Sequence, residues 1–397
     1  MNVKEIVKDI YYVGVNDRVT EKFEALWALP NGVSYNSYVV KDAKNALIDT
    51  VEVTDAPVLL NHIRRIIGDA PLHYLVINHM EPDHSGSIPV VLEAYPAIKI
   101  VGNKQTIGMV KGFYHIENDD RFIEVADGAE LSLGEKTFKF LLTPMVHWPE
   151  TMMTYCPERE LIFSGDAFGT FGALNGGIID YETDIDVYIR EMYRYYGCIV
   201  GKYGKFVQKA LEKVAPLKLS YVCSTHGPVW HERIAEVSAI VDRLSRYEPE
   251  AGVTIIYASM YGNTTEVAEA IANELANLGV KNIKIHNAAK ADMSDMISDA
   301  FRYEGLIVGA PTYSMTLFPP VATFMRAMVT REVKNKVFAA FGSFTWAPAA
   351  LKKIEGYANQ LGWNLEATLL MKQSITDEVL ADCRSLAEAV HSKLTLK

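Results

Sequence analysis

Short apolar runs alternate with amphipathic stretches throughout the second half of the chain. The apolar runs lie at 253–258, 282–287, 305–311, 336–342 and 365–372. Each has the length and composition of a strand, and the stretches between them carry apolar residues at helical spacing. Thr265–Leu278 predicts one helix, closed by Gly279 as a C-cap, and 376–394 predicts the last one. Strands that alternate with helices over short connections predict a doubly wound parallel sheet of five strands, with a ligand crevice beyond their carboxyl ends.

The first half has a less regular pattern, in which apolar runs end abruptly in histidine or aspartate. These runs lie at 34–40, 45–50, 74–79, 99–103, 138–144, 160–166 and 219–227. The pattern predicts polar groups presented at strand ends over an apolar sheet. Between the halves, 246–252 (RYEPEAG) contains a proline, a glycine and several charges, which predicts a linker. We therefore expect one domain over 1–248 and a second over 253–397.

Composition and charge narrow the class of protein. The 397 residues are 49% apolar and 22% charged, and no run reaches the roughly 18 apolar residues of a membrane span. We expect a soluble cytoplasmic protein without a membrane partner. A formal charge of -10 argues against nucleic-acid binding, which rewards clustered positive charge. The cysteines form no CxxC pair, so they predict no rubredoxin-type or zinc-ribbon module.

The sharpest chemical signal is HMEPDH, which follows the apolar run YLVIN and contains His79, Glu81, Asp83 and His84. Ionisable groups alternating at one strand end would repel or desolvate badly without a cation. Three further candidates follow other apolar runs: His147, Asp166 and His226. Any one of these alone would be read as a hydrogen-bonded histidine or a turn aspartate. Together the set predicts two divalent ions bridged by one carboxylate.

A second candidate site lies in the loops of the C-terminal half. SMYGNTTE (259–266) joins the first strand to its helix, and its small and hydroxyl residues at a helix N-terminus suit a phosphate. It is neither a Walker motif nor GxGxxG, which disfavours a dinucleotide, and alone it would read as a capped helix start. APTYSM (310–315) and GSFTWAP (342–348) follow the third and fourth strands and add aromatics beside the same crevice.

The first motif resembles the metallo-β-lactamase signature HxHxDH followed by separate His, Asp and His ligands, with Glu81 in the place of the second histidine. An added carboxylate makes the ligand set harder, which favours iron over zinc. The loops of the second half resemble the FMN loops of flavodoxin. The combination resembles the flavodiiron proteins (A-type flavoproteins) over essentially the whole chain. It implies a metallo-β-lactamase-like αββα sandwich followed by a flavodoxin-like five-stranded parallel sheet.

The resemblance also assigns ligands. It implies one iron held by His79, Glu81 and His147, another held by Asp83 and His226, and Asp166 as the bridge. His84 is expected to hydrogen-bond without ligating. Tyr195, within MYRYYG, resembles a tyrosine near the open face of the irons, where it would donate a hydrogen bond or a proton. Its neighbours Tyr193 and Tyr196 are alternatives, and a role in the core is another.

The flavin residues are implied in the same way. The phosphate and ribityl chain of FMN would lie on Ser259, Met260, Gly262, Asn263 and Thr264. The isoalloxazine would be lined by Pro311, Thr312, Tyr313, Ser343, Phe344 and Trp346. Trp346 has structural packing as its alternative role.

The resemblance implies an oxidoreductase that relays electrons through FMN to a diiron centre and reduces dioxygen to water, nitric oxide to nitrous oxide, or both. The donor would be a separate protein such as rubredoxin or another small redox protein, or a reduced deazaflavin. A head-to-tail homodimer, or a dimer of dimers, would place FMN beside the partner's irons, with Trp148 at that interface or in the core. The alternatives are a zinc hydrolase with an accessory flavodoxin domain, and an electron carrier whose first domain is only a scaffold.

Overall fold

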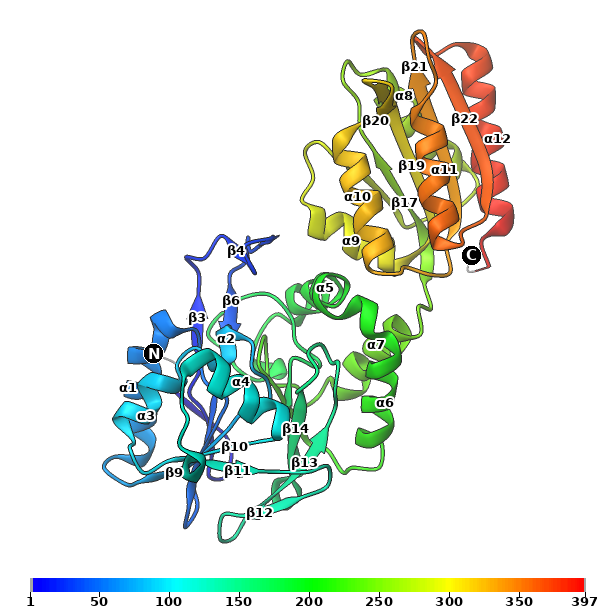
Figure 1. Ribbon diagram of the computed structural model, residues 1–397. Helices are drawn as coiled ribbons and strands as arrows, with labels where there is room; N and C mark the ends of the chain where they lie inside the picture. The colour runs from blue at the N-terminus through cyan, green and yellow to red at the C-terminus, as the bar shows by residue number, and fades with distance from the viewer. Residues whose placement is uncertain (1–2, 396–397) are drawn as a thin grey trace. The chain divides into compact units, whose positions relative to one another are not determined.

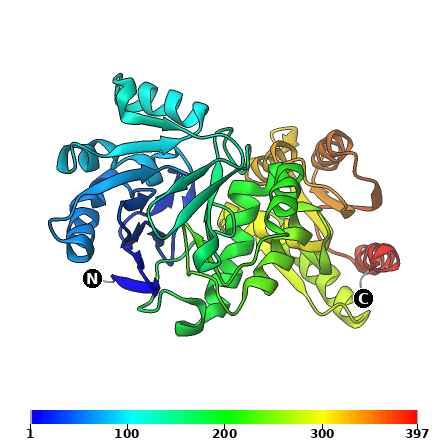
Figure 2. The ribbon, with the colours of Figure 1, turned by 90° about the horizontal axis from the view of Figure 1, so that it is seen from below.

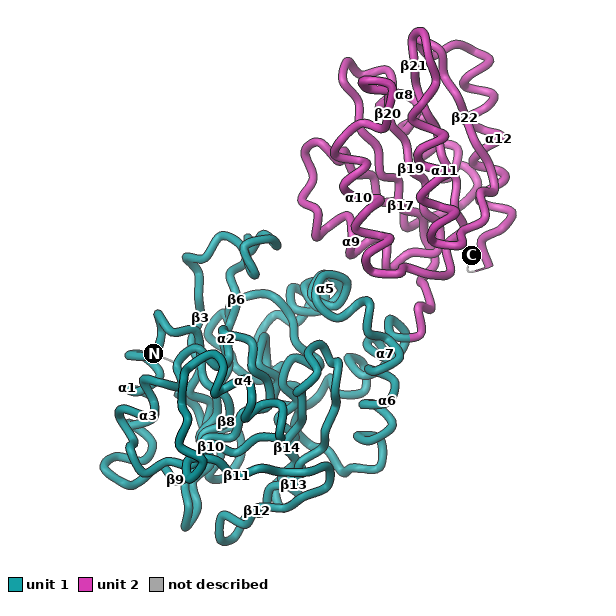
Figure 3. The backbone as a smooth tube through the Cα atoms, in the orientation of Figure 1, with its two compact units in different colours: residues 1–245 teal, residues 246–397 magenta. Residues whose placement is uncertain are grey.

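The computed structural model describes residues 3–395, and the chain divides into two compact units, Met1–Ser245 and Arg246–Lys397 (Figure 3). The first unit contains two main sheets and the second contains one. None of the helices in the described part of the chain is long and apolar enough to cross a membrane.

The first unit contains a seven-stranded and a five-stranded sheet. In spatial order the larger sheet has β1 (Lys4–Val7), β2 (Ile10–Tyr12), β7 (Tyr38–Val40), β8 (Asn45–Ile48), β9 (Leu72–Val76), β10 (Lys99–Gly102) and β11 (Phe122–Glu124). The smaller has β12 (Glu130–Ser132), β13 (Thr137–Leu142), β14 (Met152–Cys156), β15 (Leu161–Gly165) and β16 (Tyr221–Ser224). Two ribbons stand apart, β3 (Val15–Asp17) with β6 (Val33–Tyr35), and β4 (Lys22–Phe23) with β5 (Trp27–Ala28).

The apolar core of this unit lies between the two sheets. The strands that border it come from apolar runs without alternation, which is the pattern of strands buried on both faces. All four residues of β8 and all five residues of β14 and of β15 are buried. The ring of Tyr38 in the larger sheet lies 5.3 Å from that of Phe163 in the smaller, and its hydroxyl donates to Ser224 O at 2.7 Å. The sheets are therefore joined by both packing and hydrogen bonds.

Helices cover the outer faces of this sandwich (Figures 1 and 2). Beside the larger sheet lie α1 (Ala56–Ile67), α3 (Ile88–Ala94) and α4 (Lys104–Tyr114), and beside the smaller lie α5 (Ile185–Tyr195), α6 (Gly204–Val214) and α7 (Ile234–Ser245). A single turn, α2 (Pro82–Ser85), lies inside the HMEPDH motif. This αββα arrangement confirms the predicted fold class of the first half.

The second unit is a doubly wound parallel sheet, as predicted. Its strands are, in spatial order, β18 (Ile283–Asn287), β17 (Glu250–Tyr257), β19 (Tyr303–Tyr313), β21 (Val337–Phe344) and β22 (Leu365–Lys372). Its helices are α8 (Asn263–Asn277), α9 (Met293–Arg302), α10 (Pro319–Thr330), α11 (Ala350–Leu361) and α12 (Asp377–Lys393). The strand order is flavodoxin-like, and the order reverses between β17 and β19, where ligands of such sheets bind.

Packing in this unit follows the predicted periodicity. Helices α8 and α12 share one face of the sheet, where Ile271 and Leu386 join Ile255 in one buried cluster. Helices α9, α10 and α11 contact strands of the sheet, and Figure 1 shows them in front of it. On β19, a Cβ at Gly309 would lie 2.0 Å from the Phe341 ring, so glycine lets that ring rest on the neighbouring strand.

Two details differ from the sequence prediction. The expected linker 246–252 is partly a strand, because β17 begins at Glu250, which pairs with Tyr303 and accepts a hydrogen bond from Arg302 Nε at 2.8 Å. The structure also adds β20 (Thr316–Leu317), which pairs antiparallel with the end of β19. Two residues are too few to show the alternation by which a strand is recognised in a sequence.

Candidate metal centre and cofactor pocket

The candidate metal ligands of the first unit follow the carboxyl ends of strands in both sheets. HMEPDH follows β9, Asp166 follows β15 directly, and His226 lies two residues after β16. Because β15 and β16 are parallel neighbours, with Gly165 opposite Ser224, their carboxyl ends lie together. The sheets are also joined here, since Met152 N–H donates to Asn78 O at 3.0 Å. Residues far apart in the sequence thus meet at one end of the sandwich.

The first of two groups contains His79, Glu81, His147 and Asp166, all buried, with ligand atoms within 4.8 Å of one another. His147 Nε2 lies 3.1 Å from Glu81 Oε2 and 3.0 Å from Asp166 Oδ2. His79 Nε2 lies 3.3 Å and 3.5 Å from the same two oxygens. Two imidazole nitrogens and two carboxylate oxygens therefore converge on one point.

The second group contains Asp83, His84 and His226. His84 Nε2 lies 3.1 Å from His226 Nε2, and Asp83 Oδ2 lies 3.2 Å and 3.3 Å from these two nitrogens. Asp166 Oδ1 is 3.1 Å from His84 Nε2 and 3.8 Å from His226 Nε2. One oxygen of Asp166 thus faces each group. The expectation that His84 hydrogen-bonds without ligating stays a prediction, since its Nε2 points into the group.

Hydrogen bonds behind the groups fix which nitrogen two of the four histidines, His79 and His226, present. Glu150 Oε1 accepts from His79 Nδ1 at 2.8 Å and from Met80 N–H at 2.8 Å. The carbonyl of Ser34 accepts from His226 Nδ1 at 2.8 Å. In their neutral forms these two histidines would keep the proton on Nδ1 and direct an Nε2 lone pair inward, which is the arrangement of metal-ligating histidines. Thr225 Oγ1 donates to Asp166 Oδ1 at 2.6 Å and holds that carboxylate in place.

The electrostatics of these groups fit metal cations. Burial alone would lower the pKa values of His84 and His147, but the surrounding carboxylates raise each to about 9. Burial would likewise raise the pKa of Asp166, yet the adjacent histidines hold it well below its ordinary value. Both oxygens of Asp83 are buried without a hydrogen bond from the described residues. In the absence of metal, protons on the histidines balance the negative charge of the carboxylates. Two divalent cations would neutralise the same charge when bound.

The structure distinguishes Tyr195 from Tyr193 at the end of α5. The Tyr195 ring lies 5.5 Å from that of His226, and its side chain is almost fully buried. Burial, and then the charges of Asp166 and Glu81, hold the pKa of Tyr195 well above its ordinary value, so its hydroxyl keeps its proton. The hydroxyl of Tyr193 instead accepts from Arg243 Nη2 at 2.6 Å.

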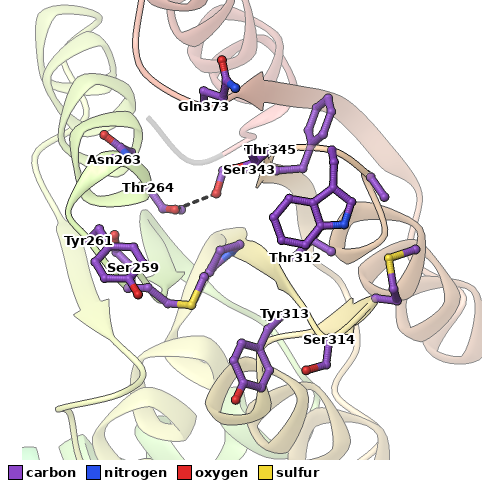
Figure 4. Close-up of a pocket in the computed structure, with 16 residues that line it drawn as sticks. Ser259, Tyr261, Asn263, Thr264, Thr312, Tyr313, Ser314, Ser343, Thr345 and Gln373 are labelled. Carbon is purple, nitrogen blue, oxygen red and sulfur yellow. Dashed lines mark hydrogen bonds between the residues drawn. The ribbon is translucent and has the colours of Figure 1, made fainter.

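A cavity of about 550 Å³ lies at the carboxyl ends of β17, β19 and β21 (Figure 4). Its lining consists of Ser259, Met260, Tyr261, Asn263, Thr264, Pro311, Thr312, Tyr313, Ser314, Met315, Ser343, Phe344, Thr345, Trp346, Ala347 and Gln373. All predicted flavin residues lie on it except Gly262. That volume falls in the usual range for a cofactor pocket. Trp346, which lines this cavity, is 85% exposed.

The polar end of this pocket is built around the start of α8. Gly262, at φ +101°, precedes the helix, and its N–H donates to Ser259 Oγ at 3.0 Å. Thr264 Oγ1 and Ser343 Oγ are 2.9 Å apart, joining two of the three loops (Figure 4). The lining contains no lysine or arginine, so hydroxyls and the helix N-terminus are the groups that suit a phosphate.

Several residues at these sites carry no recognisable sequence signal. Glu150 lies one residue beyond a proline, and its role becomes visible only from its contact with His79. Glu24 lies between the strands β4 and β5, where burial and the Glu81 charge raise its pKa to about 7, and it accepts from Trp27 Nε1 at 2.9 Å. In the pocket, Tyr261 and Gln373 join the lining, and Gln373 belongs to none of the three loops.

Comparison with known proteins matches each unit to a known family. Residues 33–227 match the family described as ODP family beta lactamase, and 255–385 match flavodoxin. An uncharacterised protein of Methanocaldococcus jannaschii is 32% identical over 96% of both chains. The anaerobic nitric oxide reductase flavorubredoxin of Aeromonas hydrophila is 30% identical over 96% of this chain and 77% of its own.

Solved structures match over the whole length. Rubredoxin oxygen:oxidoreductase from Desulfovibrio gigas superposes with a TM-score of 0.93 at 27% identity, over 99% of this chain and 100% of that one. The flavodiiron protein of Giardia intestinalis superposes with a TM-score of 0.93 at 26% identity, over 99% and 97%. An αββα sandwich with a histidine–carboxylate cluster, joined to a flavodoxin unit, defines a two-centre redox flavoprotein. The chain belongs to the flavodiiron proteins, and it is an oxidoreductase.

The contact between Glu150 and His79 gives a testable prediction. Glu150→Gln removes the charge that orients and polarises the imidazole, so we expect the affinity of the site for ferrous ion to fall about 10- to 100-fold. The measurement is anaerobic competition with a coloured chelator. Glu130→Gln, on the exposed face of β12, is the control and should bind like the unaltered protein. Equal affinity in both variants would show that Glu150 does not support the metal.

Proposed function

We propose that this protein reduces dioxygen to water, nitric oxide to nitrous oxide, or both, at a diiron centre supplied with electrons through FMN, and so removes these gases from the cell. The observation that carries the proposal is the position of Asp166, with one carboxylate oxygen toward each of two ligand groups. A bridging carboxylate is suited to holding two ions close enough to act on one small molecule. The relatives named for oxygen and nitric oxide reduction support the same reaction class.

The proposed ligand set contains three carboxylates. His79, Glu81 and His147 would hold one iron, Asp83 and His226 the other, and Asp166 both. Carboxylate oxygen is a harder donor than imidazole, so Glu81 biases the set toward iron rather than zinc. The proposed FMN site is the pocket of the second unit. When bound, FMN and iron supply one- and two-electron transfer to a small gas molecule.

The chain's own residues contribute orientation and a proton. Glu150 and Ser34 hold the histidines by their Nδ1 atoms, which keeps both Nε2 atoms aimed at the centre. Tyr195 keeps its phenolic proton at neutral pH, and its hydroxyl is our candidate donor toward a substrate that gains negative charge as it is reduced. Every member of the cluster except the half-buried Asp83 is buried, and burial strengthens each of these interactions.

The turnover test uses protein of known iron and FMN content, supplied anaerobically with a chemically reduced donor. We expect consumption of dioxygen, nitric oxide or both, with iron and FMN bound. Asp83→Ala and His226→Ala should lose turnover and keep the flavin absorbance, because they alter only the first unit. Asp69→Ala, an exposed residue after α1, should be fully active. Zinc in place of iron, with ester or lactam hydrolysis and no gas consumption, would establish the hydrolase instead.

The electron donor and the assembly belong to the same proposal. We infer that a separate small redox protein, of the rubredoxin type, reduces FMN, and that a head-to-tail homodimer brings each FMN to the partner's irons. Supporting this, Tyr261 is 91% and Trp346 85% exposed at the pocket rim, and exposed aromatics of this kind are typical of contact surfaces. Trp148 lies 5.3 Å from the His79 ring and is half-buried, so it can reach such an interface.

Assembly is tested by sedimentation together with activity. We expect the protein to sediment as a dimer or a dimer of dimers. Turnover per chain should fall on dilution below the dissociation constant of the dimer, because each FMN then loses the irons of the partner subunit. A preparation that sediments as a monomer and keeps full activity would contradict the shared-site arrangement.

A further inference from the structure

A second, much smaller cavity lies directly behind Asp166 in the first unit. It has a volume of about 20 Å³. It is lined by Val146, Asp166, Ala167, Phe168, Gly169, Met192, Tyr195, Tyr196, Val200, Val207 and Val241. Asp166 and Tyr195 are also part of the candidate metal centre, so the cavity adjoins that centre.

Most of the walls of this cavity are buried and apolar, and the polar side chains in its lining are those of Asp166, Tyr195 and Tyr196. Val200, Val207 and Val241 each expose 5% or less of their surface, and Met192 exposes 1%. They come from four elements, since Met192 lies on α5, Val200 on the turn that follows it, Val207 on α6 and Val241 on α7. The cavity therefore lies between these helices and the end of the smaller sheet.

The gap follows from an irregularity in the chain. After α5 the helix continues as a π-helical turn, Tyr196–Val200, which widens the backbone and shifts the side chains that follow. Single turns of this kind are frequent at functional sites. Gly169 closes the opposite side, where a Cβ would lie 3.2 Å from the Tyr195 ring. A larger residue at that position would push the ring into the gap.

A cavity of this size and lining suits one class of ligand. About 10–15 Å³ is enough for one water-sized molecule, but a buried water also needs two to four polar partners. Apolar cavities stay dry and accept xenon or small apolar molecules. Dioxygen and nitric oxide are compact molecules that form only weak hydrogen bonds, so they lose little on leaving water for such a space.

We propose that this cavity is a holding site for a diatomic gas, placed between α5, α6 and α7 and the Asp166 side of the metal centre. A gas molecule in it contacts Asp166 and Tyr195, which both face the candidate ligands. The cavity thereby raises the concentration of gas next to the centre. That the ligand is dioxygen or nitric oxide rests on the proposed function, whereas the binding of xenon in the cavity does not.

The test begins with crystals of the FMN- and iron-loaded protein pressurised with xenon. We expect one anomalous peak between Asp166 and Val207. Val207→Ile adds one methylene, which is about enough to fill a space this small, and should remove the peak. Val207→Ala enlarges the cavity and should retain it. Val241→Ile fills the same space from α7 and serves if the first variant folds poorly.

Steady-state kinetics give the second measurement. Val207→Ile should raise KM for the gas by roughly threefold or more and leave kcat at saturating gas unchanged, because only access is altered. Val110→Ile, buried on α4, is the control and should change neither value. Absence of xenon from the cavity, or an unaltered KM in both filling variants, would overturn the proposal. Xenon binding in a protein that consumes neither gas would leave the cavity established and contradict the proposed function.

Discussion

The first unit is organised around the burial of carboxylates that face one another. Glu81, Asp83 and Asp166 lie within a few ångströms among four imidazoles, and Glu81 and Asp166 are buried while Asp83 is half-buried. Such a cluster is costly unless positive charge compensates it. Protonated histidines can supply part of that charge, as the raised pKa values of His84 and His147 indicate. Two divalent cations would supply it more completely, and the ligand atoms already point to two positions.

The architecture provides what this cluster requires. Parallel strands bring Asp166 and His226 together at one sheet edge, and the facing sheet contributes His79 and Glu81. Groups further out, including Glu150, Ser34 and Thr225, hold the ligands by hydrogen bonds rather than by packing alone. The pocket of the flavodoxin unit also depends on its local structure. Among the described residues no lysine or arginine lines it, so hydroxyl groups and the N-terminus of α8 are the groups suited to a phosphate. In both units the candidate site residues lie at or after the carboxyl ends of strands.

The sequence predicts the fold class correctly, and most residues that it nominates for the two candidate sites lie together in the structure, for identifiable reasons. Long apolar runs with clear periodicity locate β17, β19 and β21, and the HMEPDH motif is dense enough to signal a cation without any structure. What it does not predict depends on contacts between distant residues. Glu150 and Glu24 have ordinary neighbours in the sequence and are recognised only by what they touch. The sequence does not predict the start of β17 at Glu250, because the proline and charges around it are typical of a linker.

The central claim is that two metal ions neutralise the buried carboxylates of the first unit. The most direct measurement is anaerobic calorimetric titration of metal-free protein with ferrous ion, in buffers of different ionisation enthalpy near neutral pH. We expect two ions per chain and a release of protons on binding, because His84 and His147, with pKa values near 9, must give up protons to become ligands or neutral partners. Binding of a single ion, or binding without proton release, would contradict the account.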